Sequence, residues 1–158
     1  MSVVSKHEDV VPTGPASYHP IVVAEAPSLR SELLLAMDAA GITIEAVARR
    51  EALSEYEIGA RTVLIFACDV DRPTDMTALR RLRRDHPAPP IVVVSPRSTA
   101  TAVRRTLDAG ADAIVFEPEI DVALVASVRA VESGQSVVPR KVRAGVERPN
   151  LSHRARQV

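Results

Sequence analysis

The chain has 158 residues, of which 46% are hydrophobic, so it can bury the core of one domain and is too apolar to be disordered throughout. Its 20 Lys and Arg residues balance its 20 Asp and Glu residues, and this zero formal net charge excludes a global attraction to DNA or to an anionic membrane. Aromatic residues make up only 3%, so the core must be built from Val, Ile, Leu and Ala, as in parallel sheets covered by Ala-rich helices.

Cysteine content and targeting patterns indicate the cellular compartment. Cys68 is the only cysteine, which excludes an internal disulfide framework and is typical of a reducing cytoplasm. No apolar run approaches the roughly 20 residues that a membrane-spanning helix needs. The first residues also lack the basic and then apolar pattern of a signal peptide. We therefore expect a cytoplasmic protein with no membrane partner.

Residues 1–41 predict an arm, a strand and a helix. Residues 1–20 mix polar residues with Pro and Gly without periodicity, which is typical of a flexible arm. The apolar run Ile21–Ala24 predicts a buried strand. Pro27 and Ser28 predict the start of a helix with Ser28 as its N-cap, and Gly41 stands where a C-cap glycine would end that helix.

Two further strands and a basic helix are predicted in the middle of the chain. Ile42–Ala48 predicts a short second strand, whereas residues 49–60 are weakly patterned and predict no more than a short helix. Val63–Cys68 is a third apolar run and predicts another buried strand. A helix around Met76–Leu82 follows. Its polar face carries four arginines that we expect to be solvated: Arg80, Arg81, Arg83 and Arg84.

The last third of the domain repeats the same alternation. Ile91–Val94, three valines and an isoleucine, is the most strand-like segment of the chain. Thr99–Asp108 predicts the fourth helix, Ala113–Phe116 the fifth strand and Asp121–Ser133 the fifth helix.

Apolar strands joined by helical crossovers must run parallel, with helices on both faces of the sheet. Right-handed crossovers then predict an α/β fold, a doubly wound five-stranded parallel sheet in the order 2-1-3-4-5. In such sheets, functional groups collect beyond the carboxyl ends of the strands. The segments that stand there are Glu25-Ala26, Ala67–Asp69, Ser95-Pro96 and Glu117-Pro118.

Several segments between Ile21 and Gly134 resemble, in order and spacing, the receiver domain of LuxR-type two-component response regulators. The clearest is Leu107–Ala113, which reads LDAGADA. The resemblance implies a flavodoxin-like receiver domain at residues 21–135, with a regulatory role and no enzymatic activity. The other segments that carry it are Ala24-Glu25-Ala26, Ala78–Arg83 before His86-Pro87, Pro90–Ser95, and Val128–Val131 before Gly134.

Phosphorylation in this family depends on five positions. Two acidic residues after the first strand hold Mg²⁺, and an Asp at the end of the third strand accepts the phosphoryl group. A Ser or Thr after the fourth strand and a Lys after the fifth bind that group. In this sequence the five positions hold Glu25, Ala26, Ala67, Ser95 and Glu117. One Mg²⁺ carboxylate and the acceptor are lost and the lysine charge is reversed, so the resemblance implies a degenerate pocket with no catalytic residue and no cofactor.

Asp69 is the alternative phospho-acceptor. If the third strand extends through Cys68, Asp69 lies two residues beyond the aligned acceptor position and on the same face. Asp69–Pro73 also has the family's spacing between acceptor and proline, although this alignment needs a two-residue deletion afterwards. In this alternative the acidic pocket still functions and Mg²⁺ is its cofactor; otherwise Asp69 is a solvated loop carboxylate. The nearby cation that would pair with Asp69 or Glu117 is Arg97.

The end of the sequence predicts a connection to a DNA-binding domain. Residues 136–150 read as a polar linker. Leu151–Val158 resembles the opening of a LuxR-type helix-turn-helix domain, with Ser152 as its N-cap and Ala155 in place of the Glu that would complete a capping box. On this interpretation residues 151–158 begin a domain whose DNA-reading helix is missing from this chain. The alternative is a basic disordered tail.

The leading hypothesis is a phosphorylation-independent receiver domain of a DNA-binding transcriptional regulator, acting through dimerisation or through an unidentified protein or small-molecule effector. The alternatives are a stand-alone pseudo-receiver that serves as a protein-interaction module, and a conventional phosphorelay receiver that uses Asp69. We expect a homodimer through the fourth helix, the fifth strand and the fifth helix. The charged residues predicted at the rim of that face are Arg104, Arg105, Asp108 and Glu119.

Overall fold

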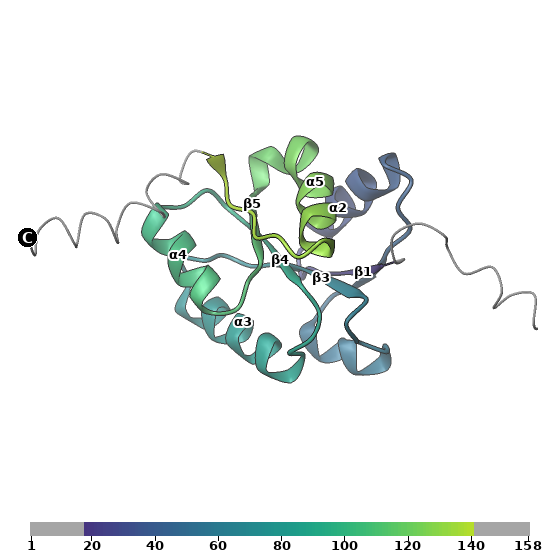
Figure 1. Cartoon of the computed structure of the whole chain (residues 1–158), viewed down its shortest axis with the longest axis horizontal. Coiled ribbons are helices and arrows are strands. Elements are labelled where there is room, and N and C mark those ends of the chain that lie inside the picture. Colours follow the sequence, from purple (N-terminus) through teal and green to yellow (C-terminus); the bar gives the residue numbers. More distant parts are fainter. Residues whose placement is uncertain (1–17, 141–158) are drawn as a thin grey trace, which may run out of the picture.

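Five strands form one parallel sheet in the order β2-β1-β3-β4-β5, and Figure 1 shows helices on both of its sides. The computed structural model describes residues 18–140. The predicted doubly wound α/β fold and its strand order are confirmed. The strands are β1 (His19–Val23), β2 (Glu45–Val47), β3 (Thr62–Ala67), β4 (Ile91–Ser95) and β5 (Ala113–Phe116).

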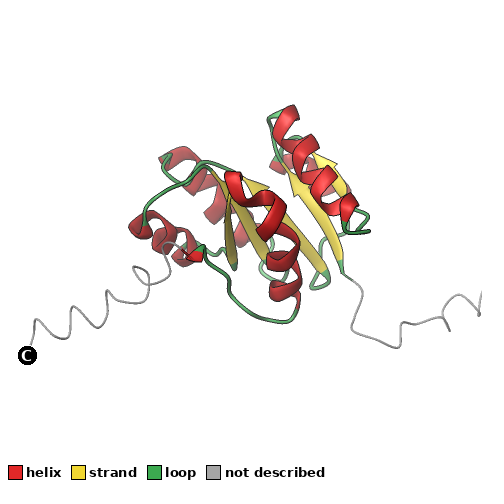
Figure 2. Ribbon diagram, turned by 90° about the horizontal axis from the view of Figure 1, so that it is seen from above, coloured by secondary structure: helices red, strands yellow, loops and turns green. Residues whose placement is uncertain are grey.

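The helices form one layer on each face of the sheet, and the twisted sheet lies between the two layers (Figure 2). Helices α2 and α5 cover one face, while α3, α4 and the 3-10 helix η1 cover the other. Within residues 18–140, no helix is both long and apolar enough to cross a membrane. The helices are α2 (Pro27–Ala39), η1 (Arg50–Glu55), α3 (Pro73–Asp85), α4 (Ala100–Asp108), η2 (Glu117–Glu119) and α5 (Ile120–Glu132).

The strands are apolar except at their ends because both faces of the sheet are covered. The polar residues at strand ends are His19, Glu45, Thr62 and Ser95. Successive side chains alternate between faces: Ile21 and Val23 join the cluster under α3 and α4, whereas Val22 and Ala24 join the cluster under α2 and α5. All residues of β4, the fourth strand in the sheet order, are buried. The core therefore consists of two apolar layers, one on each side of the sheet.

Helix boundaries differ from the sequence predictions where local capping decides them. Helix α2 begins at Pro27, and its N-cap is Ala26, so the prediction of Ser28 as N-cap is wrong. Proline is favourable at the first helical position because its missing N–H would be unpaired there anyway. Thr99 precedes α4 as its N-cap, and its hydroxyl accepts a hydrogen bond from the Ala102 amide at 3.1 Å.

The second strand is shorter than predicted because the chain turns back after α2. Gly41 has φ +77° and allows the Ile42 amide to donate to the Met37 carbonyl, which caps the helix. Only Glu45–Val47 then pairs with β1. The first strand is longer than predicted: it begins at His19, whose amide donates to the Arg61 carbonyl.

Candidate functional site

The five positions of the predicted phosphorylation pocket lie at the carboxyl edge of the sheet. Glu25 and Ala26 follow β1, Ala67 ends β3, Ser95 ends β4 and Glu117 follows β5. Because β1, β3, β4 and β5 are parallel neighbours, their carboxyl ends meet at this edge. The strand order therefore places these five residues at one edge of the sheet. The hydrogen bonds and charges around each residue indicate which chemistry it can perform.

Besides the carboxylate of Glu25, Ser95 is the pocket position that keeps the functional group that the resemblance implies. Its side chain is fully buried, and its hydroxyl accepts a hydrogen bond from the Val70 amide at 3.2 Å and donates one to the Pro96 carbonyl at 2.9 Å. The hydroxyl thus donates its proton within the protein and fixes the loop after β3. Receiving a phosphoryl oxygen would require it to give up the Pro96 bond.

Asp69 lies in the loop after β3 and not on the strand, because β3 ends at Ala67. One oxygen of its carboxylate accepts the Asp71 amide at 2.9 Å, and the other lies 3.8 Å from the Arg72 guanidinium. Its own amide donates to the Asp75 carboxylate at 2.7 Å. The bond from the Asp71 amide makes an Asx turn, in which an Asp side chain bonds to the backbone two residues on. The predicted extension of the strand through Cys68 is wrong, and the Asp69 carboxylate is used to shape its own loop.

Glu117 gives the pocket a negative charge where the family has a lysine. Partial burial raises the pKa of its carboxyl group, and the neighbouring carboxylates of Glu32 and Asp69 raise it further. A phosphoryl group would meet the same repulsion. Arg97 lies 3.9 Å from Glu119. The expected pairing of Arg97 with Asp69 or Glu117 is therefore replaced by one with Glu119.

The residues at this edge do not fit Mg²⁺. Ala26 and Ala67 supply no ligand, and the Asp69 carboxylate accepts hydrogen bonds from its own loop. Across residues 18–140, no three His, Cys, Asp or Glu side chains converge in a metal-binding arrangement. Glu25 is exposed, and a single carboxylate on a loop is a poor site for a cation that prefers octahedral oxygen ligands.

Hydrogen bonds and an ion pair join three loops at the carboxyl edge of the sheet. The Val70 amide bonds to Ser95, and the Ser98 hydroxyl donates to the Asp71 carboxylate at 2.7 Å. The contact between Arg97 and Glu119 adds the segment after β5. Contacts within the chain therefore link the edge across β3, β4 and β5.

Cys68, next to the pocket, has the properties of a structural thiol. Burial, together with the neighbouring carboxylates of Asp75 and Asp69, raises its pKa to about 12. A thiol with such a pKa carries almost no thiolate at neutral pH and is a poor nucleophile.

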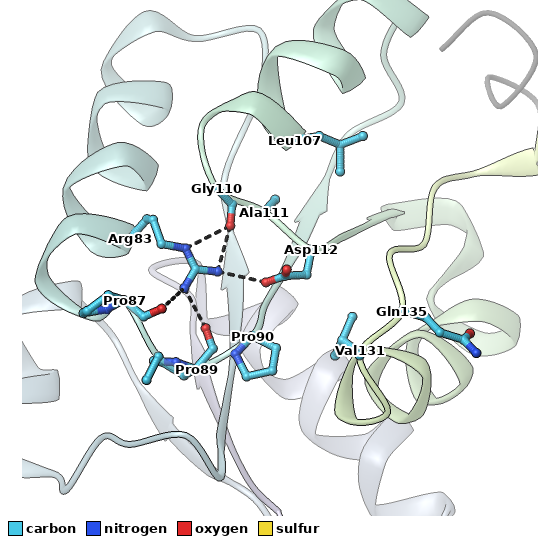
Figure 3. Close-up of a pocket in the computed structure, with 12 residues that line it drawn as sticks. Arg83, Pro87, Pro89, Pro90, Leu107, Gly110, Ala111, Asp112, Val131 and Gln135 are labelled. Carbon is cyan, nitrogen blue, oxygen red and sulfur yellow. Dashed lines mark hydrogen bonds and ion pairs between the residues drawn. The ribbon is translucent and has the colours of Figure 1, made fainter. Parts of the chain in front are cut away.

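Arg83 was predicted to be solvated, and the structure contradicts this. Its side chain is only 23% exposed and donates to the Gly110 carbonyl at 2.8 Å and to the Asp112 carboxylate at 2.8 Å (Figure 3). It also donates to three carbonyls of the proline-rich loop before β4: His86, Pro87 and Pro89. This Arg83 cluster lies at the amino ends of β4 and β5, opposite the receiver pocket, beside a cavity of about 410 Å³.

Gly110 shows why the Arg83 cluster needs a glycine. Its φ is +119°, and a Cβ added there would lie 2.7 Å from Cγ of Arg83. The sequence held one signal for this cluster: Arg83 lies four residues after Leu79, on the buried stripe of α3. The prediction of solvated arginines remains correct for Arg80, Arg81 and Arg84, which are exposed.

The segment that follows α5 in the same chain covers part of the predicted dimer face. The Ile114 amide donates to the Val137 carbonyl, and the Val137 amide donates to the Asp112 carbonyl, both at 3.0 Å. The segment after α5 therefore lies against the free edge of β5. Of the residues predicted for this face, Arg105 and Asp108 are exposed, whereas Arg104 and Glu119 are half-buried. Of the predicted linker, the structure describes residues 136–140. Residues 141–150 and the predicted start of a helix-turn-helix domain at residues 151–158 lie outside the described residues.

Comparisons with known proteins bear on the fold. No family model and no curated protein sequence matches the chain. Among solved structures, the isolated REC domain of RcsB from Salmonella enterica serovar Typhimurium in the apo form is 17% identical with a TM-score of 0.68, over 83% of this chain and 99% of that one. A LuxR family DNA-binding response regulator from Silicibacter pomeroyi is 18% identical with a TM-score of 0.64, over 78% and 98%.

A further LuxR-family regulator extends the same result. The two-component response regulator from Aurantimonas sp. SI85-9A1 is 15% identical with a TM-score of 0.67, and the match covers 86% of this chain and 99% of that one. At these identities the likeness concerns the fold, and it agrees with the strand order and with the layers described above. The structural neighbours of this chain are LuxR-family response regulators, and the chain has the fold of their receiver domains.

Proposed function

We propose that this chain is the regulatory domain of a cytoplasmic DNA-binding transcriptional regulator of the LuxR type and that it works without phosphorylation. The observation that carries the proposal is a receiver fold whose acceptor position is Ala67 and whose lysine position is Glu117. The contacts at the carboxyl edge support it, since the Ser95 hydroxyl already donates its proton to the Pro96 carbonyl. Such a domain transmits a signal through assembly or through an effector, not through a phosphoryl group.

The proposed role in DNA binding depends on the neighbours and on the end of the sequence. RcsB, one of the structures with this fold, has been solved as two dimers bound to two parallel DNAs, with 17% identity and a TM-score of 0.67 over 89% of this chain and 75% of that one. Residues 151–158, which resemble the opening of a helix-turn-helix domain, would connect the receiver fold to DNA. A paired arrangement of receivers would align two such domains on paired half-sites.

We expect the chain to form a dimer at micromolar concentration, with the same stoichiometry in the presence and absence of acetyl phosphate and Mg²⁺. The reason is that the pocket lacks the nucleophile through which a phosphodonor could change the assembly. Sedimentation equilibrium measures the mass directly. A monomer of 17.0 kDa, or a dimer that forms only with the phosphodonor, would contradict the proposal.

The dimer face is tested by charge reversal. Replacing both Arg104 and Arg105 with Glu puts like charges opposite Asp108 and Glu119 of a second copy and should weaken the dimer about tenfold or more. Arg81→Glu with Arg84→Glu, two exposed positions on α3, is the matched control and should leave the dimer intact. If the control pair weakens the dimer and the α4 pair does not, the basic face of α3 is the interface.

This chain alone should bind duplex DNA only nonspecifically. The 20 basic and 20 acidic residues balance, and the four α-helices that the structure describes in residues 18–140 all pack on the sheet. Fluorescence anisotropy with a labelled duplex should show weak binding that disappears with added salt and is competed equally by unrelated duplexes. Preference for one duplex over a scrambled one would show that the DNA-reading element lies within these residues.

A further inference from the structure

A second candidate site lies in the helical layer formed by α3 and α4, in a groove between these two helices. Arg72, Arg80 and Arg105 line a groove of about 390 Å³ there. The described residues offer no ion-pair partner to Arg80 or Arg105, and Arg72, whose side chain is 71% exposed, has only the contact of 3.8 Å with Asp69. Three arginines against one carboxylate, that of Asp71, give the lining of the groove a net positive charge that favours an anionic ligand.

Other arginines of the domain are used differently. Arg83 is bonded to carbonyls and to Asp112, Arg50 lies 3.1 Å from Glu51, and the Arg30 guanidinium donates to the Ala24 carbonyl. Arg97 contacts Glu119. The arginines around the groove are distinguished by lining one concave surface together.

The groove is not only cationic. Pro73 and Met76 of α3 line it together with the arginines, so the groove also offers an apolar contact surface. One carboxylate, that of Asp71, also lines it and already accepts the Ser98 hydroxyl at 2.7 Å. A ligand suited to this surface therefore combines negative charge with an apolar group.

We infer that this groove binds an acidic peptide segment of a partner protein, in which Asp or Glu residues flank an apolar side chain. Carboxylates would pair with the arginines while the apolar residue packs on Pro73 and Met76, which combines the charge complementarity and the helix-groove docking seen in many protein interfaces. Duplex DNA fits less well, because its phosphates make no use of an apolar contact surface. The inference names the class of partner that the proposed function leaves open, and it rests on that function.

The test uses the full chain and a short fluorescein-labelled peptide with Glu and Asp around a central Leu. We expect the anisotropy to report saturable binding that weakens as salt is raised. Arg80→Gln should weaken binding about fivefold or more, and so should Arg105→Gln. Arg81→Gln is the matched control, since Arg81 is exposed on the same helix and does not line the groove; it should bind like the unmodified chain.

Further measurements distinguish the acidic peptide from other ligands and distinguish peptide binding from dimerisation. A peptide with Lys in place of Glu and Asp should not bind, and neither a labelled duplex nor inorganic phosphate should compete with the acidic peptide at equal concentration. Because Arg105 also belongs to the predicted dimer face, the sedimentation of each variant is measured, and Arg80→Gln carries the test if the dimer changes.

The inference is overturned if the acidic peptide does not bind at millimolar concentration. It is equally overturned if Arg80→Gln and Arg105→Gln together leave binding unaltered, or if these substitutions weaken binding of duplex DNA instead. Neither result would alter the phosphodonor and sedimentation measurements, so a failure of the groove is distinguishable from a failure of the proposed function.

Discussion

Incubation with acetyl phosphate and Mg²⁺ is expected to leave the intact mass of the chain unchanged. A phosphodonor needs a carboxylate nucleophile, a metal ion and a stabilising cation, and Ala67 and Glu117 replace the first and the last of these. The Asp69 carboxylate, which is the alternative phospho-acceptor, accepts a hydrogen bond from the Asp71 amide and lies 3.8 Å from the Arg72 guanidinium. Electrospray mass spectrometry of the intact chain measures the result, with a phosphorylatable receiver treated in parallel.

A gain in mass of one phosphoryl group would contradict this expectation. Asp69→Asn then identifies the acceptor: loss of the added mass would assign it to Asp69 and would restore the conventional phosphorelay alternative. If the added mass persists in Asp69→Asn, another acidic residue at the carboxyl edge is the acceptor, and the proposed function fails as well.

The second large effect is expected from Arg83→Ala, which should lower the free energy of unfolding by about 3 kcal/mol. The substitution removes the donor that serves the carbonyls of Gly110 and Pro89, and it leaves Asp112 without its cation. Urea denaturation followed by circular dichroism measures the change. Arg81→Ala, on the exposed face of the same helix, is the matched control and should change stability by no more than about 0.5 kcal/mol.

Arg83→Lys distinguishes geometry from charge. A lysine keeps the cation beside Asp112 but cannot place donors on carbonyls from separate loops, so most of the stability should still be lost. Equal unfolding free energies for Arg83→Ala and Arg81→Ala would show that the cluster does not stabilise the domain.

Much of the fold follows from the sequence because its signals are local. The interior of a strand that is buried on both faces is apolar, and the predicted runs Val63–Cys68 and Ile91–Val94 overlap β3 and β4. Glycines with positive φ follow α2 and α4, at Gly41 and Gly110, and the stop at Gly41 is the one that the sequence predicts. The parallel order then follows from alternation and from the handedness of crossovers.

The boundaries that were wrong are those that depend on single hydrogen bonds. The predicted second strand Ile42–Ala48 loses its first residues because the Ile42 amide bonds back to Met37. Ser28 is a good capping residue by type, but α2 begins one residue earlier, at Pro27. Neither boundary depends on the periodicity of apolar residues, so the sequence pattern could not predict it.

The sequence by itself determined the parallel α/β fold and the absence of an acceptor at Ala67, since an alanine methyl group has no nucleophile in any structure. Only the tertiary structure decided that Ser95 bonds to Val70, 25 residues away, that Arg83 bonds to Asp112, 29 residues away, and that Val137 lies against β5. The physical reason is that apolar burial follows a repeat along the chain, whereas a hydrogen bond between loops depends on where distant backbone atoms meet.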